Sequence, residues 1–421
     1  EWLVDIVAPY NYSKTNIKPL ASYPESLNVY SKGDIVLVLG ASLELPTLTV
    51  TLESEGDIWF AGSNRVEARQ LEMHAGGNIG TAAKPLYLYT GGPISIAAGG
   101  DLYLEVVPVF FYSAFETLKF AELTAGGILS ASVFSAVDGD GNAFLDGDGM
   151  AIATKVLFSG PVSAGGALTL EVDNSGGHVD FRDEVTAGGD IGITAEGLIQ
   201  LFSTITTPGK VTMVSTGGIS FFNGLITAHD VDLHTDTYHL ANVRVHLTGG
   251  AVSAVALDGY AQITSVGGPL TMAKLFVGNG LAILTAEDTE ALDDMIVLAA
   301  GSALNVKNGI WLNAGDGIQV LGEGTSRGII TTEGEIHITL DATPDLPGNA
   351  TVAYTDPDPG VGATFTFDSG VYQLTGTSKT VRLQTGADAD TILLPVLAEE
   401  DYVLSMATGA GDDNLTVGRQ A

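Results

Sequence analysis

Acidic and amide side chains gather in one short segment of this sequence, at a spacing that suits a calcium ion. Asp138, Asp140 and Asn142 occupy alternate positions, and Asp146 and Asp148 follow in the same glycine-rich stretch. Alternating oxygen ligands let a tight loop wrap around Ca²⁺, which prefers carboxylate and carbonyl oxygens. Carboxylates this close together would repel one another if nothing compensated them. The segment therefore predicts a calcium site at these five residues, and a solvated Gly-Asp turn is the alternative.

This segment departs from the calcium loop of an EF-hand. Counted from Asp138, the sixth position is Ala143 rather than glycine, and the twelfth is Gly149 rather than a bidentate glutamate. A regular EF-hand is therefore not expected. Asp146 and Asp148 would have to complete the coordination shell instead.

A second set of candidate calcium ligands lies near the C-terminus, in two similar blocks. The blocks begin at Gly386 and Gly409. Their acidic members are Asp388, Asp390, Asp412 and Asp413. The alternative interpretation is that these aspartates are polar turn residues between successive repeats.

Four of the seven histidines cluster along the chain, at His229, His234, His239 and His246. The apolar alternation around His234 points its ring outward, beside Asp232 and Asp236. Imidazole together with carboxylate suits Zn²⁺, but the spacing matches no helix or strand motif for that metal. Histidines on a solvated face are the alternative interpretation.

Two runs of adjacent acids resemble the paired carboxylates of polysaccharide-cleaving enzymes. They are Asp293-Asp294 and Glu399-Glu400-Asp401. Neighbouring residues of a strand point to opposite faces, so neither run alone forms a catalytic dyad. A phosphate-binding Gly-x-x-x-x-Gly-Lys-Ser/Thr loop does not occur in the sequence.

The composition limits the classes of function. The chain has 421 residues, of which 45% are hydrophobic and only 16% charged, with 50 acidic against 17 basic residues and a net charge of −33. Nucleic acids and anionic membranes require clustered Lys and Arg, so neither is an expected partner. The absence of cysteine excludes disulfides, thiolate zinc sites and a Cys nucleophile. No apolar run of membrane-spanning length occurs, so direct membrane insertion is not expected either.

The elements that would position these residues repeat along the chain. A Gly-Gly pair followed by a short strand of alternating apolar residues begins most clearly at Gly99, Gly165 and Gly188. Further copies begin at Gly76, Gly126, Gly217, Gly249 and Gly267. The shorter intervals, such as that from Gly76 to Gly99, correspond to one turn of three short strands. The repeat predicts an all-β fold, a right-handed parallel β-helix (a solenoid), with an irregular β segment at the C-terminus.

One repeat illustrates the expected coil and leads to a domain scheme. Ile191 and Ile193 would point inward, and a Cβ at the Gly-Gly corner would clash with the turning chain. Residues 1–32 carry three prolines and no glycine, which predicts an irregular segment or a cap over the first coil. Residues 33–340 would form the β-helix. Residues 341–421 would form a proline-rich link with short strands, in which the solenoid resumes at the two acidic blocks.

The Gly-Gly-x-apolar-x-apolar repeats over residues 33–340 resemble those of large bacterial surface and secreted proteins with filamentous-haemagglutinin-like β-helices. The block from Gly409 to Leu415 resembles the end of a calcium-binding nonapeptide repeat, without the tandem run of such repeats. The first resemblance implies export, adhesion or coating of the cell envelope. It implies no catalytic residues.

The expected function is therefore that of a structural or adhesive extracellular rod at a bacterial cell surface, stiffened by Ca²⁺. Its partners would be further copies of itself, a neighbouring cell-envelope protein, or glycans. Two alternatives stay open: a carbohydrate-active β-helix enzyme, and a subunit of a self-assembling filament. Acids and bases converging on one face would favour the enzyme, and acids scattered over corners would favour the rod.

Overall fold

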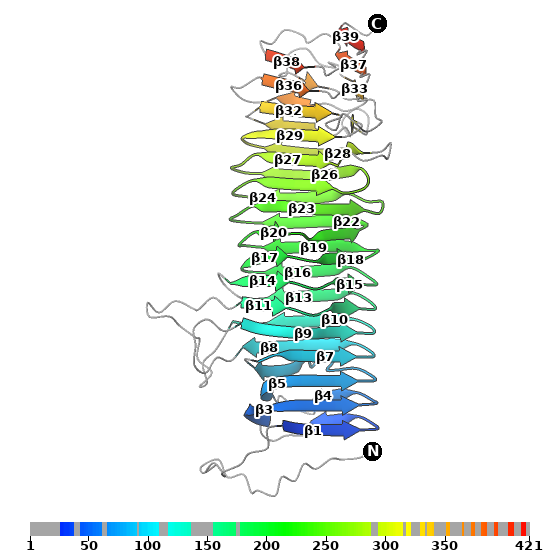
Figure 1. Ribbon diagram of the computed structural model, residues 1–421, viewed down its shortest axis with the longest axis vertical. Coiled ribbons are helices and arrows are strands. Elements are labelled where there is room, and N and C mark those ends of the chain that lie inside the picture. Colours follow the sequence, from blue (N-terminus) through cyan, green and yellow to red (C-terminus); the bar gives the residue numbers. More distant parts are fainter. Residues whose placement is uncertain are drawn as a thin grey trace, which may run out of the picture. The chain divides into compact units, whose positions relative to one another are not determined.

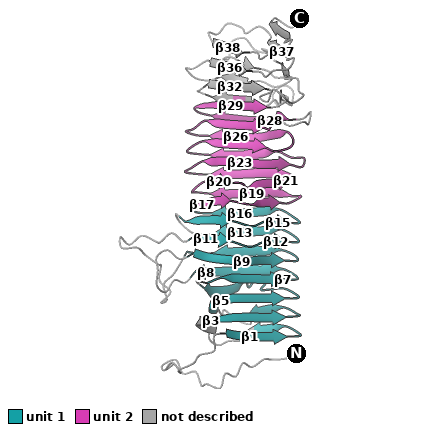
Figure 2. Cartoon of the chain, in the orientation of Figure 1, with its two compact units in different colours: residues 1–197 teal, residues 198–421 magenta. Residues whose placement is uncertain are grey.

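The computed structural model contains two compact units, residues 1–197 and 198–421 (Figure 2). Each unit is described separately below. The structure describes residues 26–37, 43–60, 65–90, 92–108, 117–135, 155–173, 177–287, 294–314, 317–320, 329–332, 335–340, 351–353, 364–365, 372–374, 380–384, 391–394, 403–407 and 414–417.

Every regular element among the described residues is a β-strand, and a helix long and apolar enough to cross a membrane is not found there. Unit 1 contains β1 (Ser26–Ser31), β2 (Ile35–Leu37), β3 (Leu43–Ser54), β4 (Ile58–Phe60), β5 (Arg65–Ala75), β6 (Leu86–Thr90), β7 (Ile94–Ala98), β8 (Leu102–Pro108), β9 (Thr117–Ala125), β10 (Leu129–Val133), β11 (Lys155–Phe158), β12 (Val162–Ala164), β13 (Leu168–Val172), β14 (His178–Phe181), β15 (Val185–Ala187) and β16 (Ile191–Ala195).

Unit 2 has the same character (Figure 1). It contains β17 (Leu198–Leu201), β18 (Thr204–Thr206), β19 (Lys210–Ser215), β20 (Ile219–Phe221), β21 (Leu225–Ala228), β22 (Asp230–Thr235), β23 (Leu240–Leu247), β24 (Val252–Ala256), β25 (Ala261–Ser265), β26 (Leu270–Val277), β27 (Ala282–Ala286), β28 (Met295–Val306), β29 (Gly309–Ala314), β30 (Gly317–Val320), β31 (Ile329–Thr332), β32 (Glu335–Leu340), β33 (Thr351–Ala353), β34 (Thr364–Phe365), β35 (Tyr372–Leu374), β36 (Thr380–Gln384), β37 (Thr391–Leu394), β38 (Val403–Ala407) and β39 (Asn414–Val417).

The strands pair in parallel from coil to coil, which confirms the predicted all-β parallel β-helix. In unit 1, β8, β10, β13 and β16 form one continuous ladder that places Leu102, Leu129, Leu168 and Ile191 side by side. In unit 2, β19, β22 and β24 form another, with Val211, Val231 and Val252 in line. Parallel pairing satisfies the backbone of each inner strand on both sides without helices. The one antiparallel pair between described strands joins β34 to β35.

Alternate residues of each strand form the core. In β13 the side chains of Leu168, Leu170 and Val172 are buried, whereas Thr169 and Glu171 are exposed. Phe120, Phe158 and Phe181 stack in one column of unit 1, with ring centroids 4.8 Å apart at both steps. This distance matches the spacing of paired strands, about 4.8 Å, so identical side chains on successive coils lie in van der Waals contact.

The Gly-Gly corners of unit 1 owe their glycines to close contact between coils. A Cβ on Gly99 would overlap the carbonyl oxygen of Gly76, and a Cβ on Gly126 would overlap that of Gly99. These glycines do not adopt a left-handed φ. In unit 2, Gly218 and Gly268 do, with φ of 111° and 147°, values that L-residues rarely adopt, whereas Gly249 and Gly250 do not.

The stretch from Gly188 to Gly217 is predicted to hold one turn of three strands and holds four. A turn still has three strands, since β17 pairs with β20, β18 with β21 and β19 with β22. Ile191 and Ile193 are buried as predicted. Residues 204–206 nevertheless form β18 and bury Ile205, because a Thr-Ile-Thr triplet between two turns is long enough to pair with β21. Near the C-terminus, β36 pairs with β38 and β37 with β39, and the offset along the chain is the same in both pairs (380 to 403 and 391 to 414). The domain boundaries at residues 32 and 340 stay predictions.

Candidate functional site

The predicted calcium ligands all lie outside the described residues. The sequence places the first set between β10, which ends at Val133, and β11, which begins at Lys155. The first set is Asp138, Asp140, Asn142, Asp146 and Asp148, and the C-terminal set is Asp388, Asp390, Asp412 and Asp413. Within the described part of the chain, no three His, Cys, Asp or Glu side chains come together to hold a metal ion.

A column of Asp and Asn side chains runs along the glycine-containing corners of unit 1. Asp34 Oδ1 accepts a hydrogen bond from the backbone N of Asp57 at 3.0 Å, and Asp57 Oδ1 accepts one from Asn78 N at 2.6 Å. The pattern continues from Asn78 to Asp101 N at 2.7 Å and from Asp101 to Ile128 N at 2.8 Å. We call Asp34, Asp57, Asn78 and Asp101 the corner ladder. Each of these hydrogen bonds satisfies a backbone N–H at the corner. It contributes about 0.5–1.5 kcal/mol to the free energy of unfolding.

The corner ladder explains the second glycine of three pairs, at Gly77, Gly100 and Gly127. A Cβ on Gly77 would overlap the carboxylate of Asp57, and a Cβ on Gly100 would overlap the amide of Asn78. Asn78 follows Gly76-Gly77, and Asp101 follows Gly99-Gly100. Ile128 occupies the equivalent place after Gly127, and its backbone N donates the last of these hydrogen bonds. Its side chain has no oxygen to accept a further one.

Unit 2 repeats the interaction at Asp230. Its Oδ1 accepts a hydrogen bond from Ala251 N at 2.9 Å, and its Oδ2 contacts His229 Nδ1 at 2.9 Å. The backbone hydrogen bond from Ala251, followed by the interactions with His229 and Lys210, holds the pKa of Asp230 below its ordinary value. The folded chain therefore favours the ionised carboxylate.

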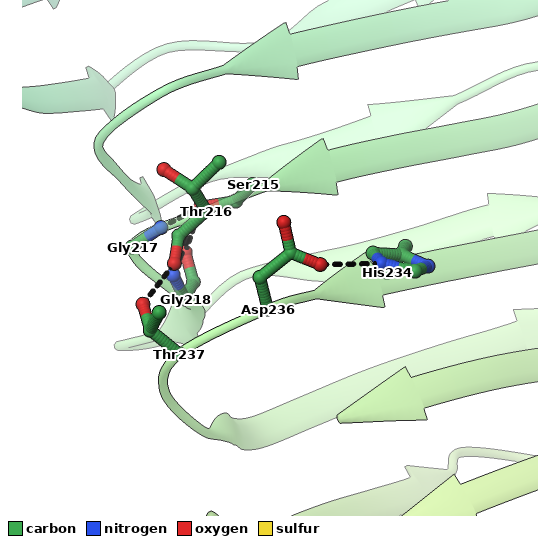
Figure 3. Close-up of polar contacts among 7 residues, drawn as sticks. All are labelled: Ser215, Thr216, Gly217, Gly218, His234, Asp236 and Thr237. Atoms are coloured by element: carbon green, nitrogen blue, oxygen red, sulfur yellow. Dashed lines mark hydrogen bonds and ion pairs between the residues drawn. The ribbon is translucent and has the colours of Figure 1, made fainter. Parts of the chain in front are cut away.

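The four clustered histidines do not share a site. His234 points outward as predicted, and its Nε2 lies 2.7 Å from Asp236 Oδ1 (Figure 3). Asp232 instead pairs with Lys210 Nζ at 2.9 Å. His229 contacts Asp230, as described above. The ring of His239 stacks on Tyr260 with centroids 4.2 Å apart.

The last histidine of the cluster, His246, contacts the carbonyl oxygen of Val266 through Nδ1 at 2.8 Å. Each of the four therefore has its own neighbour, and a shared zinc site is not formed.

Figure 3 also shows the corner near His234 and Asp236. There Ser215 Oγ accepts hydrogen bonds from the backbone N of Gly217 and Gly218, and the Thr237 hydroxyl contacts the Thr216 carbonyl.

One buried acid with two basic partners lies in unit 1. Asp180 on β14 has no exposed side-chain area, and its Oδ2 lies 2.7 Å from Lys155 Nζ and 3.2 Å from Arg182 Nη2. The other carboxylate oxygen, Oδ1, is buried without a hydrogen-bond partner. Burying a carboxylate is costly unless it is paired, so both cations hold Asp180 in place. An acid and two bases thus come together at Asp180. The acids of the corner ladder are instead distributed over successive corners.

One ladder of unit 2, like most other strands of that unit, is built from strands without acidic residues. The strands β23, β25, β27 and β29 contain no Asp or Glu, although the chain carries 50 acidic residues. Buried residues such as Ile263 and Leu284 alternate on these strands with outward-facing ones. We call the outward-facing set the polar face: Arg244, Gln262, Thr264, Ile283, Thr285, Trp311 and Asn313.

Sequence reasoning did not identify Asp180, the corner ladder or the polar face. The corner ladder had a readable signal, since Asp or Asn follows a glycine at four consecutive corners, at 34, 57, 78 and 101. Of the two predicted runs of adjacent acids, the described residues include only Asp294. Asp294 is buried, whereas Asp293 and residues 399–401 lie outside the described residues. Comparison with family models, curated proteins and solved structures finds no match to this chain.

Proposed function

We propose that this chain is a structural and adhesive segment, a rod, of an extracellular bacterial protein. The observation that carries the proposal is the corner ladder. The same side-chain hydrogen bond recurs from Asp34 to Ile128 over successive coils of unit 1, together with the stacked Phe120, Phe158 and Phe181. Interactions that repeat at every coil strengthen a stack along its length, because each coil contacts only its neighbours.

The charge of the chain supports a role outside the cell. A net charge of −33 on 421 residues keeps a protein soluble and opposes non-specific binding to anionic surfaces. It also attracts divalent cations, and we propose Ca²⁺ as the ion that the segment from Asp138 to Asp148 binds. Self-association, a neighbouring cell-envelope protein and glycans are the proposed partners.

Small-angle X-ray scattering by the full chain tests the rod. A compact globule of 421 residues would have a radius of gyration of about 22 Å. Stacked coils add about 4.8 Å each along one axis. We expect a radius of gyration clearly above the globular value and a pair-distance distribution with a long tail. A symmetric distribution at the globular value would refute the rod.

A second candidate function is polysaccharide cleavage. The observation that favours it is the convergence of three charged residues of unit 1: Lys155 on β11, Asp180 on the adjacent strand β14, and Arg182 directly after β14. Against it, the Asp180 carboxylate is fully buried, whereas a catalytic acid must touch its substrate. New reducing ends from polygalacturonate or xylan, lost in Asp180→Asn, would establish the enzyme. If the intact protein produces no new reducing ends, polysaccharide cleavage is refuted and the structural rod remains the proposed function.

A further inference from the structure

The outward-facing side chains of the polar face carry little charge. Its four strands carry no acid, and its one base, Arg244, pairs with Glu287 at 3.6 Å beyond the end of β27. A face of neutral side chains on a chain of net charge −33 suits an uncharged ligand. A polyanion would be repelled by the chain as a whole.

The outward-facing residues form two straight rows. The register places Gln262 beside Ile283 and Ile283 beside Trp311 in the first row. The second row runs from Thr264 through Thr285 to the next coil. Neighbours within a row are about 4.8 Å apart, and the rows lie about 6.6 Å apart because side chains of one face alternate along a strand. The result is a flat, regular array on a rigid sheet.

The second row supplies hydrogen bonds of both kinds. Thr264 and Thr285 each offer a hydroxyl that donates and accepts, and the amide of Asn313 offers donors and an acceptor. Asn313 Nδ2 donates to Thr285 Oγ1 at 3.4 Å, a long bond that leaves capacity on both groups. Arg244 adds further donors at the start of this row.

The first row supplies an apolar platform. Trp311 is 43% exposed and lies between Ile283 and the next coil. An indole ring has a flat apolar face and one polar N–H, so it can cover an apolar surface while its edge stays wet. Large apolar side chains exposed on a soluble protein mark binding surfaces when polar groups surround them.

We propose that the polar face binds an uncharged polysaccharide. A sugar ring would lie on the Trp311 indole, since pyranose C–H groups form an apolar surface. Its hydroxyls would exchange hydrogen bonds with Thr285 and Asn313, and the polysaccharide would extend along the rows from coil to coil. This inference deepens the adhesive part of the proposed function and rests on it.

Affinity electrophoresis of the full chain tests the proposal, with hydroxyethylcellulose, galactomannan or dextran cast into native gels. We expect at least one of these to retard the protein, and Trp311→Ala to weaken the apparent affinity about tenfold, with Trp311→Phe restoring most of it. Trp59→Ala is the matched control, since Trp59 is 37% exposed on β4 of unit 1. Its retardation should equal that of the unaltered protein.

A second variant keeps the test decisive if Trp311→Ala fails to fold. Thr285→Val removes only a hydroxyl from β27 and should also weaken retardation. No retardation by any uncharged polysaccharide, equal retardation of all variants, or stronger binding to polygalacturonate or chitosan would overturn the proposal. Scattering by the same protein decides the rod independently, so the two failures are distinguishable.

Discussion

Asp57 Oδ1 accepts a hydrogen bond from the backbone N of Asn78 at 2.6 Å, between residues that are distant in the sequence. This contact joins one corner of unit 1 to the next. Asn78 then makes the same contact with Asp101 N at 2.7 Å. The corner-ladder residues therefore join successive coils, and their identity can be tested directly.

Replacing Asp57 with alanine should destabilise the chain by about 1–3 kcal/mol, because the N–H of Asn78 loses its acceptor. Asp57→Asn should cost much less, since asparagine occupies the next rung at Asn78 and keeps an acceptor oxygen. Urea denaturation of both variants measures the difference. Equal losses would mean that the negative charge matters and the hydrogen bond does not.

A methyl group at the corner should be far more damaging than one on a strand. Gly99→Ala places a Cβ against the Gly76 carbonyl and should cost about 1–3 kcal/mol or more. Gly192→Ala on β16 is the control, because the nearest atom to its Cβ is the Leu168 carbonyl oxygen at 4.0 Å. We expect it to be neutral or stabilising by about 0.4–1 kcal/mol. Thermal melts of the two variants measure the difference in stability. Similar melting temperatures would contradict the steric explanation.

The stability of unit 2 should depend on the ionisation of Asp230. Its pKa is lowered in the folded chain, chiefly by the backbone hydrogen bond from Ala251. A group whose folded pKa is depressed adds stability above its unfolded pKa and loses it as the pH falls through the folded value. The melting temperature should therefore fall less between pH 7 and pH 3 in Asp230→Asn than in the unaltered protein. Parallel pH profiles would show that this carboxylate is not linked to folding.

Calcium should raise the melting temperature if the proposed ion site exists. A ligand at 100 times its Kd stabilises the folded state by about 2.7 kcal/mol. We expect a rise with Ca²⁺ over EDTA at constant ionic strength, lost when Asp138, Asp140 and Asp148 are changed to asparagine together. Asp388→Asn with Asp390→Asn is the control for the C-terminal set. Identical melts in Ca²⁺ and EDTA would remove the ion from the proposal.

Local sequence was sufficient to predict the repeating fold. Apolar alternation and glycine pairs identify strands and corners because both are short-range patterns, as at Leu168 and Gly165. The polar face could not be predicted this way. Its rows depend on which residues become neighbours across coils, and the offset between partners is shorter from Ala261 to Ala282 than from Ala282 to Ile310.

Asp180 was missed for a related reason. It occupies an outward position of β14, where an acid is ordinarily solvated. Its burial follows from Lys155, which lies on the neighbouring strand β11, and from Arg182 on its own segment. Such a charge cluster is visible only once the coils are stacked, since Lys155 and Asp180 belong to successive coils and are distant in the sequence.

Removal of one whole coil is the most direct test of a chain built to repeat. Deleting residues 231–251 would place Val252 beside Val211, in the position that Val231 occupies now, and Ala261 beside Ile219. We predict a cooperatively folded protein with unchanged far-ultraviolet circular dichroism per residue and a similar melting temperature, because each coil depends only on its neighbours. Deleting residues 231–241, half a coil, should abolish folding of unit 2 by putting its strands out of register. Loss of folding in both deletions alike would contradict a modular rod.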